Sequence, residues 1–159
     1  MSSSGRPQTR IQILEAARAV FEDLGYYGGS LGAVAKKAGV SRQAIYLHFP
    51  TKAELLTALH LHIFDTDVVP ALQRHPILDA MTGLEVLDAT IAADAEIVDR
   101  VWRIHESLTV ARRQNPEVDQ TLLAREQEHY DGLVDVGRRL ERDGALPPAV
   151  PVELFTDML

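Results

Sequence analysis

The segment from Ser30 to Phe49 constrains the fold more than any other part of this 159-residue sequence. Ser30 is a suitable N-cap for a short helix that ends near Ala38, and Gly39 can adopt the left-handed conformation that a tight turn requires. Ser41 can cap a second short helix. Helices of this length are not stable alone in water, so the two must pack against each other and against a neighbouring element. The sequence therefore predicts a helix-turn-helix.

The second helix of this pair, expected from Arg42 to His48, has an apolar anchor and an outer face. Ile45 is the anchor, and Ala35 on the first helix is small enough for a close crossing. The outer face carries Arg42, Gln43, Ala44, Tyr46, Leu47 and His48. Such a face is short enough to enter a major groove, where arginine can pair with guanine or a phosphate and glutamine with adenine. The pattern favours binding to duplex DNA.

Other groups near this face can position DNA through its backbone. The hydroxyl groups of Ser41 and Tyr46 and the ammonium of Lys52 can reach phosphates, and the helix N-termini at Ser30 and Ser41 add partial positive charge. The small and apolar members of the face can touch thymine methyl groups. The predicted DNA-binding residues are Ser30, Ser41, Arg42, Gln43, Ala44, Tyr46, Leu47, His48 and Lys52.

Charge is divided unevenly along the chain. Residues 1–60 carry seven Lys and Arg against four Asp and Glu, whereas the rest carry nine Arg against nineteen acidic residues. The net charge of −7 thus combines a basic segment with an acidic remainder. This asymmetry indicates one segment that meets a polyanion and another that does not. Near the N-terminus, Arg6 and Arg10 either reach a neighbouring groove or belong to a solvated tail.

The whole chain is predicted to be all-α. Apolar residues recur at helical spacing, and no stretch alternates with a period of two for long enough to form a strand. Helices are expected at about 8–24, 31–38, 42–48, 52–67, 82–94, 96–114 and 117–143, with another that begins near Val152. We expect a DNA-binding domain over residues 1–51 and a helical domain over 52–159. The second is expected to be incomplete at its C-terminus, because the sequence stops inside a helical pattern.

Three stretches of the sequence resemble a known family. Residues 13–26 resemble its first helix, residues 34–42 its helix-turn-helix, and residues 45–52 its exit motif, which includes Tyr-x-His-Phe-Pro-x-Lys. Over about residues 9–60 the chain is similar to the N-terminal domain of the TetR (tetracycline repressor) family. The resemblance implies base contacts from Arg42, Gln43, Ala44 and His48 and phosphate contacts from Ser30, Tyr46 and Lys52.

The resemblance also implies that an all-helical ligand-binding and dimerisation domain comes after the DNA-binding module. From it we expect a homodimer that represses transcription from a palindromic operator and responds to a small-molecule effector, and the absence of cysteine fits a cytoplasmic protein. The sequence departs from the family pattern at Gly28, Gly29 and Gly32, where bulkier or polar residues are common. These glycines are expected to weaken the start of the first short helix.

Candidate ligand-binding residues lie in the predicted long helices. Trp102, His105 and Thr109 share one helix face, Tyr130 lies on the apolar stripe of the next long helix, and Phe64 lies in the connecting helix. Aromatic rings of this kind can stack on a ligand while their polar neighbours donate hydrogen bonds. The alternative is that all five are core residues whose polar ends are satisfied within the protein.

Other function classes have little support in the sequence. The absence of cysteine excludes disulfides and thiolate sites, and the six histidines are too scattered to predict a metal site. With no Gly-rich phosphate loop, Gly-x-Ser-x-Gly elbow or His-Glu-x-x-His motif, we expect neither an enzyme nor a cofactor. No signal peptide or long apolar run is evident, so no membrane partner is expected. The remaining alternative is a helical protein-interaction adaptor, which leaves the basic segment unexplained.

Overall fold

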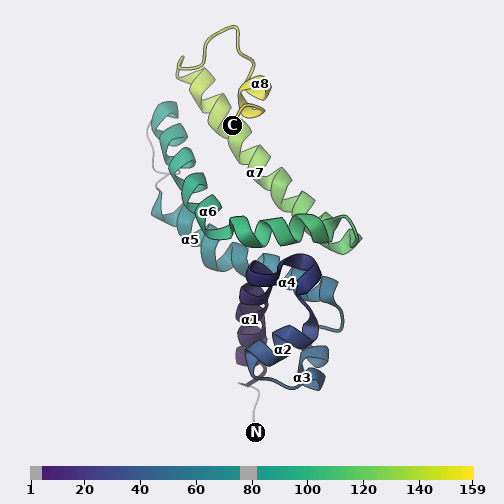
Figure 1. The fold of residues 1–159 in the computed structure, drawn as a ribbon. Helices are drawn as coiled ribbons and strands as arrows, with labels where there is room; N and C mark the ends of the chain where they lie inside the picture. Colours follow the sequence, from purple (N-terminus) through teal and green to yellow (C-terminus); the bar gives the residue numbers. More distant parts are fainter. Residues whose placement is uncertain (1–4, 76–81) are drawn as a thin grey trace. The chain divides into compact units, whose positions relative to one another are not determined.

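A computed structural model of the chain describes residues 5–75 and 82–159, and these contain helices and no strand (Figure 1). The all-α prediction is confirmed for this part of the chain. The elements are α1 (Gly5–Gly28), α2 (Leu31–Ala38), α3 (Arg42–His48), α4 (Lys52–Ile63), the π-helical turn η1 (Phe64–Val68), α5 (Val69–Arg74), α6 (Gly83–Arg112), α7 (Pro116–Arg142) and α8 (Val152–Thr156).

Two expectations about helix boundaries were wrong. The helices expected at 82–94 and 96–114 are one helix, α6, because residues 84–112 contain neither glycine nor proline to interrupt it. The helix expected to end near residue 67 continues through η1 into α5. Pro70 cannot donate a hydrogen bond to the carbonyl four residues earlier, and the helix widens into a π turn at this point.

The fold groups into two compact units. The first contains Met1–Asp65 and Val101–Leu122, and the second contains Thr66–Arg100 and Leu123–Leu159. Helices α6 and α7 therefore each contribute a segment to both units. The division into domains at residue 51 stays a prediction. The first unit holds all of the predicted DNA-binding residues.

The core of the first unit combines the first four helices with parts of α6 and α7. Phe21 of α1, Ile45 of α3 and Leu56 of α4 are all fully buried, and Ile104 and Leu108 of α6 join the same apolar cluster. Each fully buried side chain of this size contributes roughly 1.5–3 kcal/mol relative to its exposed state. The DNA-binding helices are thus fixed by a core that extends well beyond residue 51.

The second unit has a smaller apolar cluster and a surface ion-pair network. Val86 of α6 packs with Val136 and Leu140 of α7. On α6, the carboxylate of Glu96 pairs with Arg74 of α5 and with Arg100. The Arg74 and Arg100 side chains are about half exposed, so these pairs add little to stability.

One helical stretch in the described part of the chain, Lys52–Arg74, passes a test of length and mean hydropathy for crossing a membrane. The same test is passed by core helices of proteins that do not enter membranes. Leu55, Leu56 and Leu59 of this stretch are fully buried in the core of the first unit. Packing in this core accounts for the apolar character of these three positions.

The connection from α1 to α2 depends on two glycines. Gly25 has a φ of 65°, which kinks α1, and its carbonyl accepts a hydrogen bond of 3.0 Å from the N–H of Gly29. Gly29 is buried, and a Cβ atom there would lie 2.4 Å from ring atoms of the buried Phe21. Gly29 therefore has a packing role, because it lets the turn lie directly on the Phe21 ring.

We predict that Gly29→Ala destabilises the protein by about 1–3 kcal/mol, because the added methyl group overpacks a core that includes Phe21. The control is Gly132→Ala on α7, where a Cβ atom meets nothing within 4 Å. That change should stabilise the protein by about 0.5–1 kcal/mol through helix propensity. Urea unfolding of both variants measures the two effects, and equal stabilities would contradict the packing role.

Candidate nucleic-acid interface

Serine caps and a left-handed glycine build the helix-turn-helix, as the sequence predicts. The Ser30 hydroxyl accepts a 3.1 Å hydrogen bond from the N–H of Ala33, and the Ser41 hydroxyl accepts one of the same length from Ala44. Gly39 has φ and ψ of 67° and 26°, in the left-handed region. Caps of this kind are each worth about 1 kcal/mol. Both helix starts and the turn between the helices are thus set by local residue types.

Helix α3 is held by two buried side chains. Ile45 is fully buried and Phe49, the residue that ends the helix, is 1% exposed. Both belong to the apolar cluster that includes Phe21 and Val34. Because α3 has only seven residues, this packing rather than helix propensity must determine its orientation.

The opposite side of α3 faces solvent and forms the candidate reading face. Arg42 and Gln43 are exposed, and the side chains of Tyr46 and Leu47 are 54% and 69% exposed. Two further predicted members, Ala44 and His48, are half-buried. A leucine and a tyrosine so exposed gain nothing from the core, and such a surface is typical of a site that meets a partner.

Lys52 has an intramolecular role that the sequence did not reveal. Its ammonium donates a hydrogen bond to the carbonyl of Tyr26 and lies 3.9 Å from the centroid of the Tyr26 ring. Partial burial lowers the pKa of this ammonium below its ordinary value. Lys52 therefore joins the start of α4 to the end of α1. The ammonium has three N–H donors, so the bond to the Tyr26 carbonyl leaves donors for a phosphate oxygen.

Tyr26 and Tyr27 connect the end of α1 to the turn between α6 and α7. The side-chain amides of Asn115 and Gln114 donate hydrogen bonds of 3.2 and 3.0 Å to the hydroxyl oxygens of Tyr26 and Tyr27. Nearby, the buried hydroxyl of Ser107 on α6 donates to the carbonyl of Phe21 at 3.0 Å. These bonds tie segments far apart in sequence into the first unit.

Arg10 belongs to a helix and not to a free tail. It lies on α1, and its guanidinium carbon is 4.5 Å from the centroid of the Phe49 ring, at the end of α3. A cation over an aromatic face contributes on the order of 0.5–1 kcal/mol at an exposed site. The side chain of Arg6, the other basic residue of this segment, lies outside the described part of the structure.

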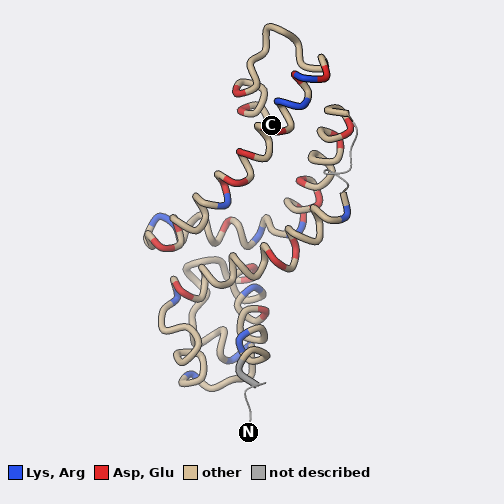
Figure 2. The backbone as a smooth tube through the Cα atoms, turned by 180° about the vertical axis from the view of Figure 1, so that it is seen from behind, with Lys and Arg blue, Asp and Glu red and all other residues tan. Residues whose placement is uncertain are grey.

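Charge in the structure follows the division seen in the sequence. Figure 2 shows acidic positions recurring along α6 and α7. Lys36 and Lys37, in the last turn of α2, are exposed and lie in the same unit as the reading face. Basic residues of this unit can neutralise the negative charge of DNA phosphates.

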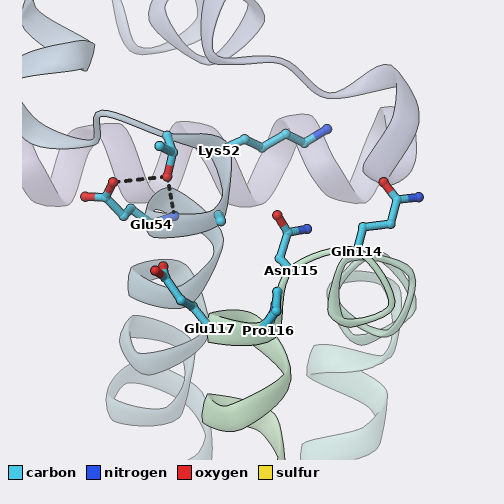
Figure 3. Close-up of a pocket in the computed structure, with 8 residues that line it drawn as sticks. Lys52, Glu54, Gln114, Asn115, Pro116 and Glu117 are labelled. Atoms are coloured by element: carbon cyan, nitrogen blue, oxygen red, sulfur yellow. Dashed lines mark hydrogen bonds between the residues drawn. The ribbon is translucent and has the colours of Figure 1, made fainter.

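A cavity of about 450 Å³ lies beside the start of α4, within the first unit (Figure 3). Its lining consists of Thr51, Lys52, Ala53, Glu54, Gln114, Asn115, Pro116 and Glu117. In Figure 3 the Lys52 side chain extends away from Glu54. None of the predicted ligand-binding residues lines this cavity.

The predicted ligand-binding residues are distributed over both units. Phe64, Trp102, His105 and Thr109 belong to the first unit and Tyr130 to the second. The Trp102 side chain is 57% exposed, whereas Thr109 and Phe64 are half-buried. The Tyr130 hydroxyl donates to Asp157 at 3.3 Å. The exposure of Trp102 and His105 shows that they are not core residues of this structure, and ligand binding by the set stays a prediction.

Taken together, the two capped helices, the αL glycine between them and the solvent-facing side of α3 define a helix-turn-helix DNA-binding domain. Residues 13–59 match the family model of bacterial regulatory proteins of the tetR family. Over this segment the chain is similar to the TetR family of transcriptional regulators.

Individual relatives agree with this assignment. The HTH-type transcriptional regulator ArpR of Pseudomonas putida is 36% identical over 103 residues, which cover 64% of this chain and 49% of ArpR. The chain thus spans about half the length of this curated relative. The TetR-family regulator PfmR from Thermus thermophilus superposes with a TM-score of 0.75 at 25% identity, covering 92% of this chain and 79% of PfmR.

A further solved structure shares the fold. FadR from Bacillus subtilis, solved in complex with stearoyl-CoA, gives a TM-score of 0.75 at 22% identity. The superposition covers 93% of this chain and 79% of FadR. The all-helical architecture predicted from the sequence is therefore that of solved regulators.

We predict that Lys52→Met lowers the free energy of unfolding by about 1–2 kcal/mol, because it removes a charged donor from the Tyr26 carbonyl. Methionine keeps most of the apolar stem, so the change isolates the ammonium. The matched control is Lys37→Met, an exposed position on α2 where a change within about 0.5 kcal/mol is expected. Thermal unfolding without DNA makes the comparison, and an unchanged stability for Lys52→Met would show that the contact contributes nothing.

Proposed function

We propose that the chain is a ligand-responsive transcriptional repressor that binds a palindromic operator as a homodimer. The observation that carries the proposal is the reading face of α3, which is held from behind by Ile45 and Phe49 and is open to solvent in front. A protein-interaction adaptor is not favoured, because it gives no reason for basic residues to collect around this helix-turn-helix.

In the proposed complex α3 enters the major groove. Arg42 pairs with guanine or a phosphate, Gln43 pairs bidentately with adenine, and Leu47 contacts a thymine methyl group. His48 and Ala44 approach base edges in the same groove. Hydroxyl groups of Ser30, Ser41 and Tyr46 and the ammonium of Lys52 bind phosphates. Phosphate contacts set the position of α3, and base contacts set the sequence preference.

Two copies of the chain are needed to read a palindrome. In a symmetric dimer two α3 helices lie about one duplex turn apart or slightly more and reach successive major grooves. A small-molecule effector that binds one conformation more tightly shifts the population towards it and changes this spacing. The helical stretch Lys52–Arg74 connects the reading face to the rest of the chain and would transmit the change.

The proposed effector is a small molecule. The stearoyl-CoA complex of FadR, which has the same fold, supports a regulator that binds a small molecule. In this chain we propose that Phe64, Trp102, His105, Thr109 and Tyr130 contact the effector. The protein is expected to act in the cytoplasm, where its operator is.

We predict different effects on DNA binding for two kinds of substitution. Arg42→Ala and Gln43→Ala should each reduce discrimination between the preferred duplex and a single-base-pair variant by about 5- to 100-fold, because each removes a bidentate base contact. Lys52→Ala should weaken binding to all duplexes alike and should reduce the dependence of log affinity on log salt by about one unit. Fluorescence anisotropy with a duplex selected from a random pool measures both.

The matched control is Arg113→Ala, which removes an exposed arginine of the same unit that is not on α3. It should leave sequence discrimination unchanged. Selection of no preferred duplex by the unaltered chain, or equal discrimination by Arg42→Ala and the unaltered chain, would contradict the assigned reading face. An adaptor or enzyme should show neither sequence preference nor a negative salt slope.

A further inference from the structure

A glycine on α2 adjoins the guanidinium group of Arg42. Gly32 is the second residue of α2, and a Cβ atom placed there would lie 3.7 Å from both Nε and Nη2 of Arg42 and 3.9 Å from Cζ. The Nε and Nη2 side of the guanidinium is thus within van der Waals contact of the position where a side chain at residue 32 would begin. The Arg42 side chain thus occupies space that most residues at position 32 would fill.

In the described part of the chain, no hydrogen bond or ion pair holds the side chain of Arg42. The first turn of α2 cannot hold it by charge either, because the N-terminus of a helix carries partial positive charge. The guanidinium therefore occupies space beside the first turn of α2 that Gly32 leaves open. An orientation of this kind is sensitive to any side chain that competes for the same space.

We propose that Gly32 is a positioning residue for Arg42, and that the base pair discriminated by Arg42 depends on the absence, at position 32, of a side chain that extends beyond Cβ. The inference rests on the proposed function, in which Arg42 contacts DNA. It assigns Gly32 a role in specificity although glycine has no group that can contact a base. The departure of Gly32 from the family pattern is then part of how this chain selects its operator.

Two substitutions at position 32 separate this role from a structural one. Alanine places its methyl group at 3.7 Å from Arg42, which is an ordinary contact, so Arg42 can keep its orientation. Glutamate is long enough to pair with the guanidinium and withdraw it from DNA. Both residues favour a helix over glycine, and glutamate in a first turn also suits the helix dipole. Neither change should unfold the protein, and both should raise its melting temperature.

The test measures the affinity of the full chain for a duplex selected from a random pool and for each single-base-pair variant of that duplex. Gly32→Glu should lose about 5- to 100-fold of discrimination at the base pair that Arg42→Ala also affects. Gly32→Ala should keep the discrimination of the unaltered chain. In the double variant Gly32→Glu/Arg42→Ala, discrimination should equal that of Arg42→Ala alone.

The double variant also measures the repulsion that the new carboxylate adds against DNA. That repulsion weakens binding to all duplexes alike, whereas displacement of Arg42 acts at one base pair. Full discrimination by Gly32→Glu, or a loss in the double variant beyond that of Arg42→Ala, would overturn the positioning role while leaving the proposed function intact. Full discrimination by Arg42→Ala would overturn both, since there would be no Arg42 contact to position.

Discussion

Burial of Ile45 and Phe49 on one side of α3 is the constraint on which the candidate interface depends. A helix of seven residues has too few internal hydrogen bonds to be stable by itself, so its place and rotation must come from the core. The same packing that buries these two side chains leaves Arg42, Gln43 and Leu47 in solvent. Because successive residues of a helix are about 100° apart, fixing the buried side also fixes which residues are available to DNA.

The core that provides this support is larger than the helix-turn-helix. Ile104 and Leu108 of α6 are buried in the same cluster as Ile45. The Ser107 hydroxyl bonds to the backbone of α1 within that cluster. A displacement of this part of α6 would therefore shift the DNA-binding helices, because their side chains are close-packed against it. The same displacement could also reach them through α4. In this chain, the reading face and part of the helical remainder form one packed body.

Local features of the interface were predictable from the sequence. The caps at Ser30 and Ser41 and the αL turn at Gly39 depend on residues within a few positions of one another, and all three have the predicted geometry. The buried position of Ile45 followed from helical spacing.

Features that depend on distant contacts were not predictable. The packing of Gly29 on Phe21 and the bond from Lys52 to the Tyr26 carbonyl join residues that only the folded chain brings together. The continuity of α6 was missed because its boundary was inferred from residues that do not stop a helix. The proximity of Arg42 to position 32 was only partly predictable: the sequence shows the unusual glycine but not that the Arg42 guanidinium lies beside it.

Alkylation of a single introduced cysteine tests the claim that α3 is buried in DNA. The sequence contains no cysteine, so the introduced thiol is the only one that can react. Leu47→Cys places a thiol on the reading face, and Leu123→Cys places one at an exposed position of α7 in the second unit. The rate of alkylation of each thiol is measured with and without a saturating amount of selected duplex. The account predicts that duplex slows alkylation at residue 47 and leaves the rate at residue 123 unchanged. An unchanged rate at residue 47 while DNA is bound would contradict it.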